Sequence, residues 1–279
     1  MKIPWRRWLR PRRILIAAIA LIVLKLFVPS LERRMVFFPF TGEDTNPGTL
    51  GIHYQPVTLT TSDNERLALW QLEPAAPIAD VVYFHGNGGN LSGWLPILAS
   101  LHRLDIRVLA VDYRGYGLST GVPSQDGLVR DAEAVARYAH AHRTPGRPLV
   151  YWGRSLGGAI AAAATRVEKP DGVILESTFP EKAAVIRRQP ILRALNLFST
   201  WDFPTVEWLR GFARPVLVMH GDRDSIIPYR LGEELFARLD APKTFVTLRG
   251  ADHNDFVDLS DRDYWDAVMA FIRGLARDS

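Results

Sequence analysis

The chain has 279 residues, a formal net charge of +4 and no cysteine. Its composition, 47% apolar and 23% charged, is typical of a globular protein and not of a disordered one. The absence of cysteine excludes disulfides, thiol catalysis and thiolate metal sites. Residues 1–34 hold nine Lys or Arg and one acid, so the rest of the chain carries a net negative charge. This distribution predicts no nucleic-acid-binding surface.

The N-terminal segment, residues 1–34, combines positive charge with an apolar run. Six cationic residues precede the run ILIAAIALIVLKLFV at 14–28. A full helical span needs about 20 residues, and Lys25 lies near enough to the end for its ammonium group to snorkel to the interface. We expect an uncleaved single-pass anchor; a cleaved signal peptide and a peripheral basic arm are the alternatives. The charge before the run predicts that the rest of the chain lies on the non-cytoplasmic side.

Residues 35–279 alternate between strand-like and helix-like periods. Two strands around an SDNE turn predict an antiparallel hairpin. After the hairpin, short apolar runs predict parallel strands and longer amphipathic runs predict helices. The expected strands are 53–61, 65–72, 80–86, 107–113, 148–153, 172–178, 215–221 and 243–250; the expected helices are 92–104, 124–142, 156–167, 229–240 and 261–276. This order predicts one α/β domain with a mostly parallel central sheet flanked by helices.

Residues 180–212 interrupt the alternation. They are rich in aromatic residues and follow neither period. We expect a small cap insertion above the sheet at this point. Its aromatic side chains have two possible roles, lining an acyl pocket or packing the cap onto the sheet, and the sequence leaves both open.

The stretch VYWGRSLGGAIAAAAT at 150–165 places Ser155 where an apolar strand gives way to an alanine-rich helix. Gly153 and Gly157 flank the serine in a GxSxG pattern. This pattern is typical of a sharp strand-to-helix turn that exposes a nucleophilic hydroxyl. The small residues after Ser155 allow the helix to pack close to the sheet, with its N–H groups directed toward a developing oxyanion.

A serine nucleophile needs a base and an acid that orients the base. His253 follows the last predicted strand, which makes it the best placed of the seven histidines. Asp222 and Asp224 follow the preceding strand, and Glu176 ends another. We favour Asp224 as the orienting acid, with Asp222 and Glu176 as alternatives. All of these loops are expected at the same edge of the sheet as Ser155.

Five motifs give the chain a resemblance to a known superfamily. They are HGNGGN (85–90), DYRGYGLS (112–119), GRSLGG (153–158), HGDRDSIIP (220–228) and GADHND (250–255). The chain resembles α/β hydrolases, and among them the serine-aminopeptidase-like group with an N-terminal membrane anchor, to which protein depalmitoylases are related. The resemblance implies a Ser155–His253–Asp224 triad. It also implies that the backbone N–H groups of Asn87 and Leu156 form the oxyanion hole.

These observations predict a serine hydrolase that cleaves an ester or thioester through an acyl-enzyme. The expected substrate is a small or lipid-like ester with an apolar acyl group. No cofactor and no metal site are expected, since the sequence holds no HExxH pattern and the His and Asp residues are accounted for by strand-end loops. The alternatives are an aminopeptidase or amidase, for which Glu181 or Asp202 would bind the substrate amine, and a non-catalytic membrane-anchored scaffold.

Overall fold

The computed structural model describes residues 14–16, 18–19, 22–23, 33–34, 36–187, 196, 199, 201–255 and 262–276. Most of the anchor predicted at 14–28 therefore lies outside the described residues. Within the described ranges, no helix has both the length and the apolar character needed to cross a membrane.

The described residues form one eight-stranded sheet in the order β10–β9–β8–β7–β4–β6–β3–β2. The strands are β2 (Tyr54–Thr60), β3 (Arg66–Leu72), β4 (Ala79–Phe84), β6 (Ile106–Asp112), β7 (Leu149–Arg154), β8 (Gly172–Glu176), β9 (Val216–Gly221) and β10 (Lys243–Leu248). β3 pairs antiparallel with both of its neighbours, β2 and β6, and the remaining pairs of this sheet are all parallel. The predicted hairpin and the mostly parallel sheet are thus both present.

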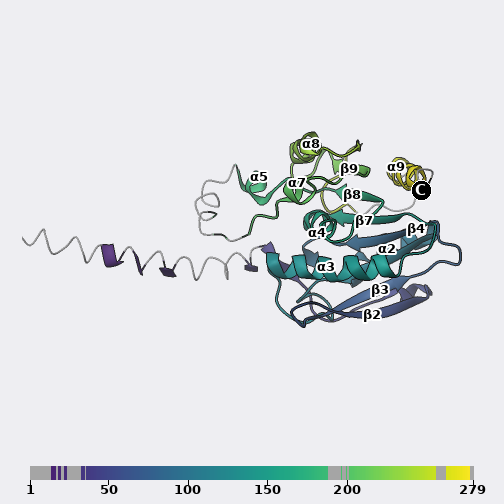
Figure 1. The fold of residues 1–279 in the computed structure, drawn as a ribbon, viewed down its shortest axis with the longest axis horizontal. Helices are drawn as coiled ribbons and strands as arrows, with labels where there is room; N and C mark the ends of the chain where they lie inside the picture. The colour runs from purple at the N-terminus through teal and green to yellow at the C-terminus, as the bar shows by residue number, and fades with distance from the viewer. Residues whose placement is uncertain are drawn as a thin grey trace, which may run out of the picture.

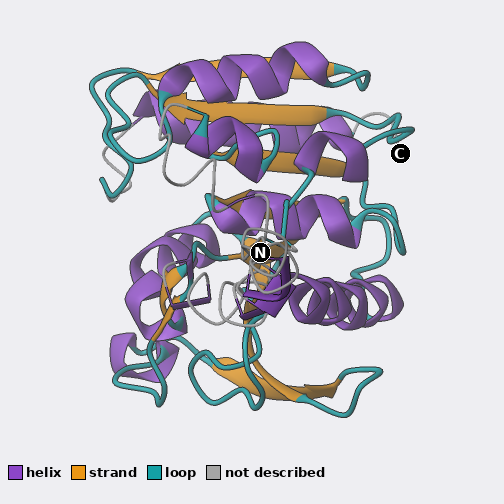
Figure 2. Ribbon diagram, turned by 90° about the vertical axis from the view of Figure 1, so that its left-hand side faces the viewer, coloured by secondary structure: helices purple, strands orange, loops and turns teal. Residues whose placement is uncertain are grey.

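Helices cover both faces of this sheet (Figures 1 and 2). The helices α3 (Gln125–Ala141), α4 (Leu156–Ala164) and α8 (Tyr229–Arg238) pack into one apolar core. The helices α2 (Leu91–Arg103) and α9 (Arg262–Leu275) pack into a second core on the opposite face. Because strands β4, β6, β7 and β8 are buried along their whole length or nearly so, their sequences read as continuous apolar runs.

Local sequence accounts for where helix α3 begins and for how closely helix α4 packs against the sheet. Ser124 is the N-cap of α3, as predicted, and its side chain accepts a hydrogen bond from the Gly127 N–H at 3.2 Å. Helix α4 is buried on all sides, and its alanine-rich sequence is the reason that it fits between the sheet and its neighbours. The central helix of the fold therefore has no solvent-exposed face.

The predicted cap region, 180–212, contains two short described helices, α5 (Lys182–Ile186) and α7 (Thr205–Trp208). Its aromatic side chains at Trp201, Phe203, Trp208 and Phe212 are all buried, and they belong to the same core as α3 and α4. Of the two roles considered from the sequence, packing onto the domain is the one that these contacts support.

Residues 36–40 belong to none of the strands or helices expected from the sequence, but they contribute to a second sheet. Strand β1 (Phe38–Pro39) pairs in parallel with β5 (Gly88–Gly89). A single 3-10 turn, η2 (Pro47–Leu50), follows before β2. The segment therefore docks against the loop that follows β4.

Candidate active site

Ser155 is the single residue between strand β7 and helix α4. Its backbone has φ 55° and ψ −122°, a positive-φ conformation that costs free energy for a residue with a side chain. Two hydrogen bonds hold it there. The Ser155 N–H donates to the Glu176 carbonyl at 2.8 Å, and the Thr178 hydroxyl donates to the Ser155 carbonyl at 2.7 Å. The strained turn directs the serine side chain away from the strand.

The two glycines of the GxSxG pattern permit a backbone approach that no side chain would allow. A Cβ atom on Gly157 would overlap the carbonyl oxygen of Phe84, at the end of β4. A Cβ atom on Gly153 would overlap the backbone of Gly157 itself. The start of helix α4 therefore lies directly against strands β4 and β7, which fixes the place of Ser155 above the sheet.

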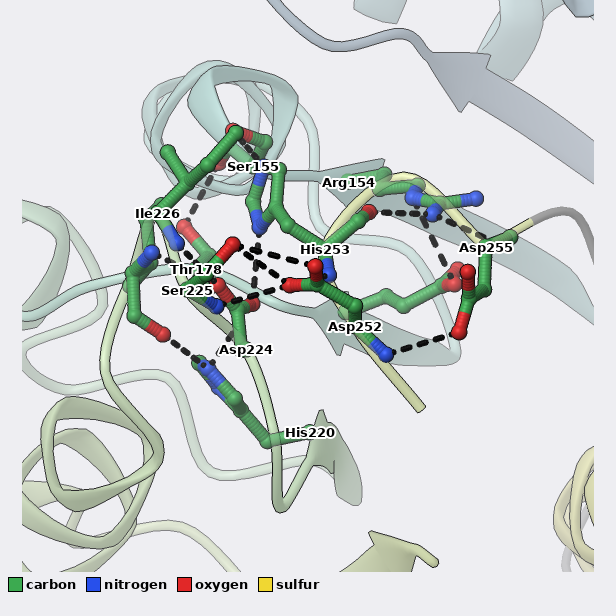
Figure 3. A network of polar contacts seen from close by, with 12 residues as sticks. Arg154, Ser155, Thr178, His220, Asp224, Ser225, Ile226, Asp252, His253 and Asp255 are labelled. Atoms are coloured by element: carbon green, nitrogen blue, oxygen red, sulfur yellow. Dashed lines mark hydrogen bonds and ion pairs between the residues drawn. The ribbon is translucent and has the colours of Figure 1, made fainter. Parts of the chain in front are cut away.

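The structure brings Ser155, His253 and Asp224 together from three separate loops (Figure 3). The His253 Nε2 lies 3.1 Å from the Ser155 Oγ, and the His253 Nδ1 lies 2.7 Å from the Asp224 Oδ2. A neutral ring with its proton on Nδ1 donates to the carboxylate and accepts the serine hydroxyl proton at Nε2. All three residues are buried. The arrangement is a continuous hydrogen-bonded path from hydroxyl to carboxylate.

The Asp224 carboxylate is surrounded by donors. Its Oδ1 accepts the N–H groups of Ile226 at 3.0 Å and Ile227 at 2.6 Å. The His220 Nε2 donates to the Ile227 carbonyl at 2.8 Å and lies 3.3 Å from the Asp224 Oδ2. Burial alone would raise the pKa of Asp224, but the hydrogen bonds from His220, His253 and Ile227 together lower it below the usual value. The carboxylate is therefore ionised at neutral pH.

The two other acids considered from the sequence have different partners. Asp222 accepts the Gly250 N–H at 2.7 Å, and Glu176 accepts the Trp152 indole N–H at 3.0 Å. Asp222 thus connects the loop after β9 to the loop after β10, as does Asp252, whose Oδ1 accepts the Ser225 N–H at 2.7 Å. These hydrogen bonds cross between the two loops that carry Asp224 and His253.

Two backbone N–H groups are available near Ser155. Within the described part of the chain, no acceptor takes the N–H of Asn87 or that of Leu156, the first residue of α4. A Cβ on Gly86 would lie 3.6 Å from the Ser155 Cβ, so this loop lies close to the serine. The His85 Nδ1 donates to the Gly86 carbonyl at 2.6 Å, which fixes the peptide plane that carries the Asn87 N–H.

Residues 36–40 support this loop, and nothing in the sequence indicated that contact. The Phe38 N–H donates to the Asn87 carbonyl at 3.1 Å, and the Asn87 side-chain amide donates to the Val36 carbonyl at 2.7 Å. Next to them, the buried Phe37 ring packs against Trp201 with a centroid separation of 5.2 Å. The FFPF stretch at 37–40 carries no alternation of polar and apolar residues, and a strand of two residues is too short for periodicity to detect.

A mostly parallel sheet with a serine at a strand–turn–helix junction, and with a histidine and an aspartate at the same edge, defines an α/β hydrolase. Residues 75–209 match the family model described as serine aminopeptidase, S33. The chain belongs to this family of the α/β-hydrolase superfamily.

The chain is also similar to proteins of other organisms and, in fold, to solved structures. An uncharacterized protein of Mycobacterium tuberculosis, Rv2307c, is 31% identical over 263 residues, which cover 92% of this chain and 93% of the relative. An uncharacterized membrane protein of Saccharomyces cerevisiae, YNL320W, is 31% identical over 234 residues, which cover 81% of this chain and 82% of the relative. The esterase Pf2001 of Pyrococcus furiosus superposes with a TM-score of 0.69 at 18% identity, covering 86% of this chain and all of that chain. The last likeness supports the fold.

The close contact at Gly157 generates a stability prediction. Gly157→Ala is expected to lower the free energy of unfolding by about 3 kcal/mol or more, because the added methyl group meets backbone atoms that cannot move aside. Urea unfolding measures the difference. The matched control is Gly93→Ala in helix α2, where a Cβ has open space, and this variant is expected to gain about 0.5–1 kcal/mol. Equal stability of both variants would contradict this account of the turn.

Proposed function

We propose that this protein is a serine hydrolase that works through an acyl-enzyme, with Ser155 as nucleophile, His253 as general base and Asp224 as the acid that orients the base. The observation that carries the proposal is the hydrogen-bonded path from the Ser155 hydroxyl through both ring nitrogens of His253 to Asp224. A serine hydroxyl becomes an effective nucleophile only when such a base removes its proton during attack.

The proposed reaction has two stages. In the first, the Ser155 Oγ attacks the substrate carbonyl while its proton passes to the His253 Nε2. The same proton then protonates the leaving alcohol or thiol as its bond to the carbonyl carbon breaks. In the second, a water molecule gives its proton to His253 and attacks the acyl-enzyme, which releases the acid and returns the proton to Ser155. Each stage passes through a tetrahedral oxyanion, for which the N–H groups of Asn87 and Leu156 are the proposed donors.

Electrostatics favours this assignment of roles. Asp224 has a lowered pKa and is ionised at neutral pH, so its charge stabilises the imidazolium form of His253 that arises during each attack. Leu156 lies at the N-terminus of helix α4, where the partial positive charge of the helix favours a developing negative charge. The donors are fixed before the reaction, so little reorganisation is needed when the oxyanion forms.

We propose an ester or thioester with an apolar acyl group as the substrate class. The fold likeness to the Pyrococcus furiosus esterase supports ester cleavage as the reaction. Glu181 gives a second support. A peptidase would use this acid to bind the amine of its substrate, but the Glu181 carboxylate is already paired with Arg238 at 2.7 Å. The family description, serine aminopeptidase, keeps amide cleavage by the same three residues as the alternative. A scaffold role needs no aligned nucleophile and base, so the geometry favours it less.

The substrate proposal is tested with p-nitrophenyl esters from acetate to palmitate and the full chain in detergent. Hydrolysis is expected, with a preference for acyl chains longer than acetate. Ser155→Ala is expected to lower kcat by a factor on the order of 10⁴ or more. Matched aminoacyl-p-nitroanilides serve as the amide series. Hydrolysis of the anilides alone would replace the esterase proposal with the amidase. Equal turnover by Ser155→Ala would contradict the proposed nucleophile.

We further propose that residues 14–28 anchor the protein in a membrane as a single pass, with the domain at 35–279 on the non-cytoplasmic side. The basic residues before the apolar run support this orientation, and the yeast relative is named as a membrane protein. Alkaline phosphatase fused to the C-terminus in a bacterial host is expected to be active, because that enzyme needs an oxidising compartment for its disulfides. A green fluorescent protein fusion that fluoresces while the phosphatase fusion is inactive would reverse the proposed orientation.

A further inference from the structure

Arg154 is a buried cation immediately before Ser155, and the proposed chemistry gives it no role. Its side chain is 7% exposed, although it lies at the end of a central strand among apolar neighbours. A guanidinium buried to this degree destabilises the fold unless its charge is balanced and its N–H groups have acceptors. The contacts that satisfy Arg154 therefore show what the fold gains from it.

The first contacts are to the loop that carries the proposed base. The Arg154 Nη2 donates to the backbone carbonyl of His253 at 2.7 Å and to that of Asp255 at 3.1 Å (Figure 3). Arg154 itself occupies the last position of strand β7, next to the strained residue Ser155. One planar side chain thus connects the backbone at the proposed nucleophile to the backbone of the proposed base.

The second contact is a buried counter-ion. The Arg154 Nε lies 3.7 Å from the Glu176 Oε1, and Glu176 is almost fully buried. The Glu176 Oε2 accepts hydrogen bonds from the Trp152 indole at 3.0 Å and the Tyr264 hydroxyl at 3.1 Å. Burial alone would lower the pKa of Arg154, but the charge of Glu176 raises it overall, so the guanidinium stays protonated. Glu176, one candidate for the orienting acid, thus faces Arg154 instead.

The third contact extends to the loop with the proposed oxyanion donor. The Arg154 guanidinium carbon lies 5.5 Å from the centroid of the Trp94 ring, within range of a cation–π interaction. The Trp94 Nε1 in turn donates to the Gly88 carbonyl at 3.2 Å, one residue after Asn87. Arg154 therefore contacts the loop of His253 directly. It also contacts Trp94, which is hydrogen-bonded to the loop of Asn87.

We propose that Arg154 is a positioning residue, balanced by Glu176, whose bonds to the His253 and Asp255 carbonyls hold the His253 ring in line with Ser155. This inference rests on the proposed roles of Ser155 and His253. The Arg154 side chain touches neither reacting atom, so its effect passes through the backbone of the base. A lateral shift of about 1 Å in such a group lowers turnover about 100-fold.

The test separates positioning from stability with three variants of the full chain. Arg154→Met removes the donors but leaves the Glu176 charge buried and unpaired, so this variant is expected to be unstable as well as slow. Arg154→Met/Glu176→Gln also removes that charge, and it is expected to recover most of the stability. In the folded double variant kcat is still expected to fall about 10- to 100-fold, with KM changed by no more than about threefold, because substrate contacts are unaltered.

Arg114→Met is the matched control. Arg114 is buried to the same degree, and it pairs with Asp131 at 2.8 Å and Asp63 at 2.8 Å. Among the described residues, its guanidinium bonds only to these two acids, neither of which lies in the loops of the site. Its loss is expected to lower stability while kcat of the folded protein stays within about threefold. A comparable fall of kcat in this control would overturn the specific role of Arg154, as would wild-type kcat in the double variant.

A second measurement is independent of turnover. Protein labelled with ¹⁵N-histidine is expected to show the His253 Nδ1–H as a strongly downfield proton resonance, because this proton is shared with a carboxylate. The resonance is expected to broaden or vanish in the Arg154→Met/Glu176→Gln variant and to persist in Arg114→Met. If the wild type cleaves no ester but the resonance still depends on Arg154, the positioning inference stands and the proposed function falls. A sharp, unshifted resonance in the double variant would overturn the inference.

Discussion

The close approach of helix α4 to strands β4 and β7 is the constraint on which the site depends. The approach requires glycine at positions 153 and 157, because a Cβ at either one would overlap backbone atoms. It leaves a single residue, Ser155, to reverse the chain between strand and helix in a strained positive-φ conformation. The free energy of this strain is offset by the full burial of α4, by a hydrogen bond to strand β8 and by another from Thr178 just after β8. Strain and burial together fix the serine hydroxyl above the sheet.

Loops position the remaining groups, and their precision comes from hydrogen bonds between loops. Asp222 and Asp252 connect the loops after β9 and β10, and the Asp224 carboxylate is held by two N–H groups of its own turn. Buried charge is part of this scheme. Arg154 and Glu176 compensate each other's desolvation, and Arg154 also donates hydrogen bonds to the backbone carbonyls of His253 and Asp255.

Among the described residues, periodicity in the sequence predicted the long strands and helices. Each of these elements is buried on one face or throughout, and its pattern of apolar residues reflects that burial. Because the strands are parallel, the loops that follow them lie at one edge of the sheet. This order predicted that Ser155, Asp224 and His253 would lie close together. Strand β1 was not predictable, since its two residues pair with a loop 50 positions away. The backbone carbonyls that accept from Arg154 were not predictable either. Every residue has a backbone carbonyl, so the sequence does not indicate which ones a buried arginine contacts.

The central claim is that Ser155 is an activated nucleophile, and covalent labelling tests it most directly. A fluorophosphonate reacts with a serine hydroxyl only when a neighbouring base removes its proton, and the adduct is stable enough to be located by peptide mass spectrometry. The account predicts one adduct per chain, on the peptide that contains Ser155, and its loss after heat denaturation before labelling. No adduct on folded protein, or an adduct at another serine, would contradict the account.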